Sequence, residues 1–286
     1  HTTFSDGVYT PEKIIAQALV SGITALAITD HDNIQAYDRA ARAVHSRHLG
    51  LELIRGVEID TDYKGKDVHV LGYYIDPHSP ELTDYCRQFR KKRLHRALEI
   101  VDKCIERGYN LDRKSVEDLL DKGGTVGRPH IARMLVDGGY CPDVKTAFDT
   151  LLYRGGPVYV PYKRWSIDEC IGLIHAAGGV AVLAHPGANM GQNRERTEAI
   201  IATGIDGIEA YCSYHDSETA AFYAGMAAQY GLIATLGSDY HGHRTKPNID
   251  LGRYSHPRPQ DVYDRLCAVI SGRGGIYPKR ERSDLR

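Results

Sequence analysis

Short apolar runs rich in β-branched residues alternate with segments of helical periodicity along most of the chain. Each run has the length of a buried strand, and together they lie at 23–29, 53–59, 67–75, 180–184, 207–211 and 232–237. Helical patterns stand between or after them, near 33–48, 166–177, 193–203, 216–230 and 259–271. This alternation predicts βα units around a mainly parallel sheet, because strands buried on both faces read as continuous apolar runs.

The stretch from 78 to 160 has a different pattern. It opens with a long charged helix pattern over 81–108, and its only strand-like run is Val158–Val160. Shorter helix patterns follow the first one, near 113–121, 128–138 and 143–152, with glycine pairs between them. We therefore predict an all-helical insertion at 78–160 that covers the substrate site, between barrel parts at 1–77 and 161–286.

The amino-acid composition limits the classes of function that this chain can have. The 36 Lys and Arg balance 37 Asp and Glu, which argues against a general binder of nucleic-acid backbones. The sequence contains no apolar run long enough to span a membrane and no apolar signal segment. The six cysteines are scattered along the chain, which is typical of reduced thiols, so we expect a cytoplasmic protein. The chain begins at His1 rather than Met, and we expect further residues, including a first strand, to precede it.

Histidine is the most informative residue type in the composition, with 14 copies, because neutral imidazole is a common metal ligand. Polar groups follow the predicted strands at their carboxyl ends, which open on one face of a β/α barrel. These groups are Asp30, His31, Asp32, Glu58, His185, Glu209, Asp239 and His241. His69 lies inside a strand, and His1 and Asp6 share a loop. Each position alone fits a helix cap, a turn or a core histidine. Together they favour a site for divalent Mn, Fe or Zn.

Six motifs then match a known family in their chain order. The motifs are H-T-x-x-S-D-G from His1, T-D-H-D from Thr29, G-V-E from Gly56, V-H-V-L-G from Val68, A-H-P from Ala184 and G-S-D-Y-H from Gly237. The chain resembles the PHP (polymerase and histidinol phosphatase) metal-dependent phosphoesterases. The segment Gly127–Ala132 resembles the branch that includes 3′,5′-nucleoside bisphosphate phosphatases, which is related to enzymes that trim short RNA 5′ ends. The resemblance implies a distorted (βα)7 barrel of the PHP type.

The same resemblance implies three metal sites. His1, Glu58 and Asp239 would form the first, together with a histidine that precedes residue 1. Glu58 would bridge to the second, with His69 and His185. Asp6, His31 and His241 would form the third. We expect two to three divalent ions, with Mn²⁺ preferred over Fe²⁺, Zn²⁺ and Mg²⁺, and a catalytic set of Asp6, His31, Glu58, Asp239 and His241.

Substrate phosphates need cations beyond the metals. The resemblance points to Arg96 and Arg128, because one guanidinium group can donate two parallel hydrogen bonds to the oxygens of a phosphate. Alternatively, Arg96 belongs to a solvated basic face of its helix. His130 stands at a predicted helix start, where it either binds an anion or caps the helix. His215 either faces the pocket or begins a helix. Lys163, Arg244 and Lys246 are weaker candidates.

The leading hypothesis is a metal-dependent phosphoesterase that removes a phosphomonoester through metal-activated hydroxide. The resemblance implies the 3′-phosphate of nucleoside 3′,5′-bisphosphates as its target, and short RNA 5′ ends as a further substrate. We expect small nucleotides or phosphate esters as partners, and neither a membrane nor an obligatory protein partner. Two alternatives remain: an amidohydrolase-like enzyme that cuts C–N bonds, and a metal- or nucleotide-binding PHP module without turnover.

Overall fold

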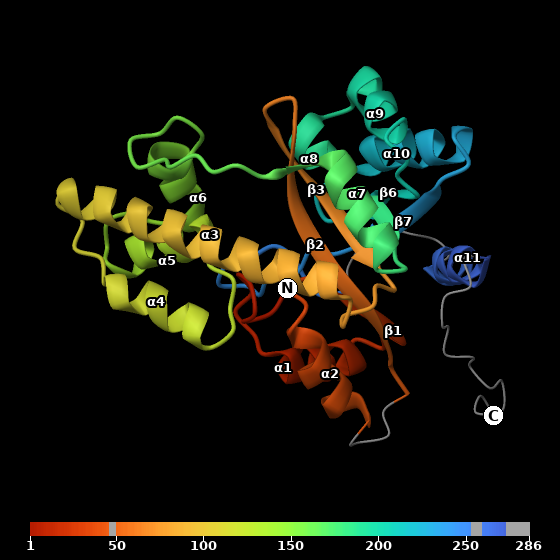
Figure 1. Ribbon diagram of the computed structural model, residues 1–286, viewed down its shortest axis with the longest axis horizontal. Coiled ribbons are helices and arrows are strands. Elements are labelled where there is room, and N and C mark those ends of the chain that lie inside the picture. Colours follow the sequence, from red (N-terminus) through yellow and green to blue (C-terminus); the bar gives the residue numbers. More distant parts are fainter. Residues whose placement is uncertain (46–49, 253–258, 273–286) are drawn as a thin grey trace.

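One curled sheet forms the centre of the computed structural model, which describes residues 1–45, 50–252 and 259–272 (Figure 1). The strand order is β1-β2-β3-β5-β6-β7, with β4 beside β2. The strands are β1 Ala25–Ile28, β2 Glu52–Tyr63, β3 Lys66–Tyr73, β4 Trp165–Ser166, β5 Val180–Leu183, β6 Gly207–Cys212 and β7 Ile233–Gly237. Six of them coincide with the six apolar runs, and the predicted α/β class is confirmed. Val158–Val160 is not a strand; the short β4 follows it instead.

The sheet is mixed rather than all parallel, because β3 runs antiparallel to both β2 and β5. Strands β2 and β3 are joined by Lys64 and Gly65 alone, both with positive φ (50° and 78°). A two-residue turn of this kind can connect only antiparallel strands. The other neighbouring pairs are parallel. The outer edges of β1 and β7 are unpaired in the described residues, and a cavity of about 560 Å³ lies between these strands and the last helix.

Helices cover the sheet, and side-chain caps mark where several begin. Thr10 caps the first and Asp216 caps the helix after β6, while Ser166 and Glu169 form a capping box. These helices are α1 Pro11–Val20, α2 Ala36–His45, α7 Ile167–Ala176, α8 Pro186–Met190, α9 Arg194–Ile201, α10 Ser217–Gln229 and α11 Pro259–Gly272. None of the described helices has the length and apolar character needed to cross a bilayer.

The stretch between β3 and β4 contains only helices, and they gather on one side of the sheet (Figure 1). They are α3 Pro80–Glu106, α4 Arg113–Asp121, α5 Arg128–Asp137, α6 Val144–Ala147 and the π-helical turn η1 Phe148–Leu152. The first half of α3 buries Tyr85 and Phe89 in the core beside the sheet, whereas its second half buries Ile100 and Val101 in a separate core. Helix α3 therefore belongs to both parts of the molecule.

Candidate metal centre

The loop that carries His1 and Asp6 is anchored by one buried carboxylate. Asp30 follows β1 and is fully buried, and it accepts hydrogen bonds from the backbone nitrogen of Thr2 (2.6 Å), from the Thr2 hydroxyl (2.6 Å) and from the Ser5 hydroxyl. A side chain at Gly7 would collide with the carbonyl oxygen of His1. Asp30, which the sequence grouped with the metal-capable residues, thus positions the loop.

Strand pairing brings the next residues to the same place. Beyond the end of β1, His31 still pairs with Glu58 of β2 as an isolated parallel bridge. His69 pairs with Asp60 across the β2–β3 hairpin, which puts it on the same face of the sheet as Glu58. After β5, His185 has a left-handed backbone (φ 26°), and its backbone nitrogen donates to Glu209 at 2.8 Å.

Glu58 is at the centre of a buried group of imidazoles. Its Oε2 lies 2.9 Å from His1 Nε2, and its Oε1 lies 2.6 Å from His69 Nδ1 and 3.0 Å from His185 Nε2. Asp239 Oδ1 lies 3.1 Å from the same His1 Nε2. Glu58 therefore contacts side chains from both sets of residues that were predicted to share it.

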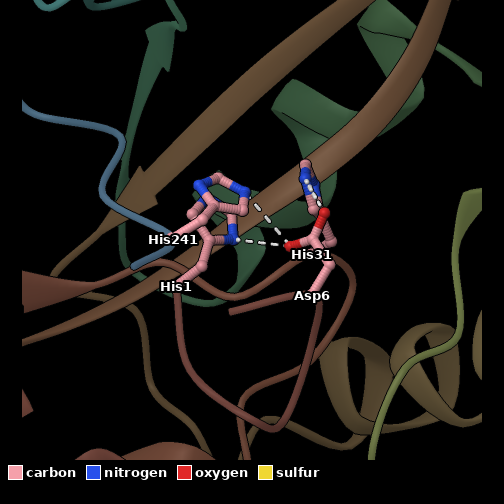
Figure 2. A group of neighbouring side chains, drawn as sticks. All are labelled: His1, Asp6, His31 and His241. Carbon is pink, nitrogen blue, oxygen red and sulfur yellow. Dashed lines mark ion pairs between the residues drawn. The ribbon is translucent and has the colours of Figure 1, made fainter. Parts of the chain in front are cut away.

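Asp6 is at the centre of a second group of imidazoles (Figure 2). Its Oδ1 lies 3.1 Å from His241 Nε2 and 3.6 Å from His1 Nδ1, and its Oδ2 lies 3.9 Å from His31 Nε2. Within each of the three predicted ligand sets, one candidate ligand atom per residue lies within 4.8 Å of the others. We call the eight residues of these sets the imidazole–carboxylate cluster: His1, Asp6, His31, Glu58, His69, His185, Asp239 and His241.

The electrostatics of this cluster fit bound cations. Burial favours the neutral carboxyl, yet the imidazoles of His31 and His69 hold the pKa of Glu58 well below its usual value. Burial disfavours the charged imidazole of His31, yet Glu58 and Asp6 raise its pKa to about 9, and Glu58 raises the pKa of His185 to about 9 as well. Buried carboxylates that stay ionised and hold protons on the neighbouring imidazoles are suitable partners for divalent ions, which compete with those protons.

Sequence reasoning missed Asp60 and Tyr214 near the cluster, and it named Lys246 only as a weaker candidate for contact with a substrate phosphate. Asp60 lies two residues beyond Glu58 on β2, and strand alternation puts both side chains on one face, which was the available signal. Lys246 Nζ and the Tyr214 hydroxyl each lie 2.6 Å from Asp239 Oδ2. Glu209, which the sequence grouped with the metal-capable residues, has its pKa raised to about 7 by burial. Only the chain's tertiary contacts bring Tyr214 and Lys246 to Asp239.

A cavity of about 260 Å³ opens over the imidazole–carboxylate cluster. Pro129 and Phe148, from α5 and η1, form part of its wall, and Tyr214 and Lys246 form another part. The helices of the 78–160 stretch therefore contribute directly to the space above the cluster.

Two predicted substrate residues occupy one positively charged region beside this cavity. Arg96 Nε donates to the carbonyl oxygen of Val160 at 2.6 Å, and Arg128 Nη2 lies 3.3 Å from Asp67. Arg164, which the sequence did not single out, donates to Asp67 at 2.8 Å. We call Arg96, Arg128, Arg164 and Asp67 the guanidinium cluster.

Two histidines predicted to face substrate instead contact the backbone. His130 Nδ1 accepts from the backbone nitrogen of Gly127 at 3.2 Å, so the ring caps α5. His215 Nε2 accepts from the backbone nitrogen of Gly187 at 2.9 Å, and its Nδ1 donates to Ala210 at 2.8 Å. These contacts favour the capping alternative for His130, and they give His215 the task of holding the turn after His185.

Comparisons with known proteins agree with this geometry. Residues 1–271 match the PHP domain. The chain belongs to the PHP family. As a member it is a metal-dependent phosphoesterase of the phosphatase kind, as the motifs predicted, and its fold is of the PHP type.

Three similar proteins show the range of the family. The 5′-3′ exoribonuclease Rnm of Escherichia coli is 36% identical over 257 residues, covering 88% of this PHP chain and 86% of the relative. A 3′,5′-nucleoside bisphosphate phosphatase of Chromobacterium violaceum is 35% identical over 246 residues, covering 84% of this chain and 85% of the relative. A Chromobacterium violaceum structure described as an amidohydrolase, with bound sulfate and no metal, superimposes with a TM-score of 0.84 at 32% identity, covering 94% of each chain.

We predict that the metal-free PHP protein loses stability as the pH rises from 6.5 to about 9. A raised imidazole pKa stabilises the folded state below the unfolded value of 6.5, and this contribution disappears as His31 and His185 lose their protons. Thermal melting of chelator-treated protein across this range measures the effect. Added Mn²⁺ should raise the melting temperature more at pH 9 than at pH 6.5, because at pH 9 fewer imidazole protons have to be displaced before the ions can bind. Equal increments at both pH values would contradict the prediction.

Replacing Asp30 with asparagine should release the loop that carries His1 and Asp6. The amide leaves at least one of three buried donors unsatisfied, so we expect the free energy of unfolding to fall by about 2–4 kcal/mol. Chemical denaturation measures this change. Asp38→Asn, on the exposed side of α2, is the matched control and should stay within about 0.5 kcal/mol of the wild type.

Proposed function

We propose that this PHP protein hydrolyses the 3′-phosphate of nucleoside 3′,5′-bisphosphates. The observation that carries the proposal is the proximity of two sites: the imidazole–carboxylate cluster on the floor of the cavity, and the guanidinium cluster, whose Arg128 lies against Phe148 of the cavity wall. A substrate with two phosphates matches this pairing, since one phosphate can react at the first site while the second is held by arginines.

The imidazole–carboxylate cluster would hold two to three divalent ions, Mn²⁺ foremost, in the three ligand sets described above. Bound there, such ions supply an activated water and neutralise charge on the transferring phosphoryl group. The protein's own residues orient the ligands. Tyr214 and Lys246 fix the carboxylate of Asp239, His215 fixes the turn of His185, and Asp30 fixes the loop of His1 and Asp6.

The guanidinium cluster has more positive charge than its carboxylate balances. Arg128 and Arg164 both pair with the single carboxylate of Asp67, and burial together with Arg128 lowers the pKa of Arg96 to about 10. Arg96 is 6% exposed, and its Nη2 has no hydrogen-bond partner in the described residues. A phosphate would satisfy this nitrogen and relieve the repulsion among the arginines.

The guanidinium cluster is also close to the wall of the cavity. The Arg128 guanidinium carbon lies 5.6 Å from the centre of the Phe148 ring, and Phe148 lines the cavity over the imidazole–carboxylate cluster. The same arrangement suits a short RNA with a 5′-phosphate, and the Escherichia coli relative is named as a 5′-3′ exoribonuclease, which indicates RNA as the substrate of that protein. RNA is therefore the second candidate substrate.

The proposal predicts fast phosphate release from adenosine 3′,5′-bisphosphate in the presence of Mn²⁺. Release from 3′-AMP and 5′-AMP should be slower, because each lacks one of the two anchoring phosphates. A phosphate assay over these three compounds, together with chromatographic separation of the mononucleotides released from a 5′-phosphorylated RNA trimer, tests the ranking, with chelator-treated enzyme as the control. Preference for 5′-AMP would contradict the bisphosphate assignment, faster cleavage of the trimer would favour RNA, and release of ammonia from amides would favour the amidohydrolase alternative.

Arg96→Ala and Arg128→Ala should each raise KM for the bisphosphate by about 10- to 100-fold, because a charge-assisted contact to phosphate is lost. KM for 3′-AMP should change far less, since its only phosphate reacts at the imidazole–carboxylate cluster. The matched control is Arg113→Ala, which removes an exposed guanidinium that pairs with Asp102 on the surface. Equal increases in KM for both substrates would count against the assigned role.

A further inference from the structure

Asp60 is a buried carboxylate that lies between two imidazoles of the cluster. Its Oδ1 is 3.1 Å from His31 Nδ1 and 3.4 Å from His69 Nε2, and the residue is 7% exposed. In the described residues neither Asp60 Oδ1 nor His31 Nδ1 makes a hydrogen bond of good geometry. Each of these two atoms therefore has the other as its nearest available partner.

The opposite nitrogens of the same two rings face the carboxylates proposed as metal ligands. His31 Nε2 is directed toward Asp6, at 3.9 Å, and His69 Nδ1 contacts Glu58 at 2.6 Å. A neutral imidazole carries one hydrogen, so a proton held toward Asp60 leaves the lone pair of the other nitrogen free for an ion. His31 would bind an ion through Nε2 and His69 through Nδ1. Asp60 Oδ1 alone can hold the proton on the other nitrogen of both rings.

Arg93 of α3 holds this carboxylate in place. Its Nη2 lies 2.5 Å from Asp60 Oδ2, and its Nε donates to Asp32 at 2.6 Å. Asp32 is fully buried and also accepts from the Tyr85 hydroxyl of α3 at 2.8 Å. Helix α3, which begins the 78–160 stretch, is thereby joined to the segment after β1 that carries His31 and to β2, the strand paired with that of His69.

The same contacts argue against Asp60 as a metal ligand itself. The guanidinium of Arg93 occupies one of its oxygens, while the other is shared between two imidazoles that have a second partner each. An ion placed between His31, Asp60 and His69 would lie close to a buried guanidinium, at a high electrostatic cost.

We propose that Asp60, held by Arg93, is a positioning residue that selects the metal-facing nitrogen of His31 and of His69. The inference rests on the proposed metal centre and deepens it, because it makes the ligand geometry depend on a contact with α3. The Tyr162 hydroxyl, 3.4 Å from Asp60 Oδ2 and 3.3 Å from Arg164 Nε, extends the connection to the guanidinium cluster.

The test compares Asp60→Asn with the wild type in the full chain, using Co²⁺ as the probe. Asparagine keeps the size of the side chain and removes the charge that holds both ring protons. We expect Co²⁺ affinity to fall about 10- to 100-fold, with an altered visible spectrum, and kcat to fall while KM for the bisphosphate stays nearly constant. Asp60→Glu, which keeps the charge, should recover part of the affinity and serves if Asp60→Asn does not fold.

Asp62→Asn is the matched control, because Asp62 lies on the same face of β2 and pairs with Arg154 away from the imidazoles. It should bind Co²⁺ as the wild type does. Arg93→Lys should give an intermediate affinity, because one ammonium group replaces a guanidinium that contacts both carboxylates. Wild-type affinity and spectrum in Asp60→Asn, with metal-dependent activity intact, would overturn this inference alone. Failure of the wild type to bind Co²⁺ or Mn²⁺ would overturn the metal centre, and the inference with it.

Discussion

The structure depends on keeping the Glu58 carboxylate ionised while it is buried. A carboxylate removed from water is costly unless cations or donors surround it, and the imidazoles of His1, His69 and His185 do so here. Those three residues come from an N-terminal loop, an antiparallel strand and the end of a parallel strand. Much of the topology can be understood as the arrangement that brings distant segments to one side chain.

This dependence explains why the sequence was informative about the metal ligands. Five of the eight proposed ligands stand at or just after the carboxyl end of an apolar run, namely His31, Glu58, His185, Asp239 and His241. The local pattern fixes their positions along the strands, and in a β/α barrel the carboxyl ends of the strands lie on one face. The mixed character of the sheet was not predicted, although the two-residue connection Lys64-Gly65 contained the signal. The strand expected at Val158–Val160 was wrong. Pairing with β2 selects Trp165 and Ser166 instead, through a contact distant in the chain.

The residues that support the site were harder to predict, because their roles depend on which partner they meet. Asp60 shares a face of β2 with Glu58, but the sequence around Asp60 does not indicate that its side chain contacts the imidazoles of His31 and His69 and the guanidinium of Arg93. Arg164 immediately precedes β4, and only the pairing of β4 with β2 brings it near Asp60 and Asp67. His130 and His215 show the converse. Their positions fit substrate contact, but packing directs their rings to backbone groups.

Helix α3 links the two chemical sites through residues one turn apart. Arg93 and Arg96 are separated by three positions, so they lie on the same face of the helix and both are buried. Arg93 neutralises the carboxylates behind the imidazoles, whereas Arg96 belongs to the guanidinium cluster that we assign to the second phosphate. A shift of α3 would therefore move both groups together. The proposed phosphate contact and the carboxylates behind His31 and His69 therefore depend on the packing of one helix, which explains why α3 is buried against the sheet in its first half and against the other insertion helices in its second half.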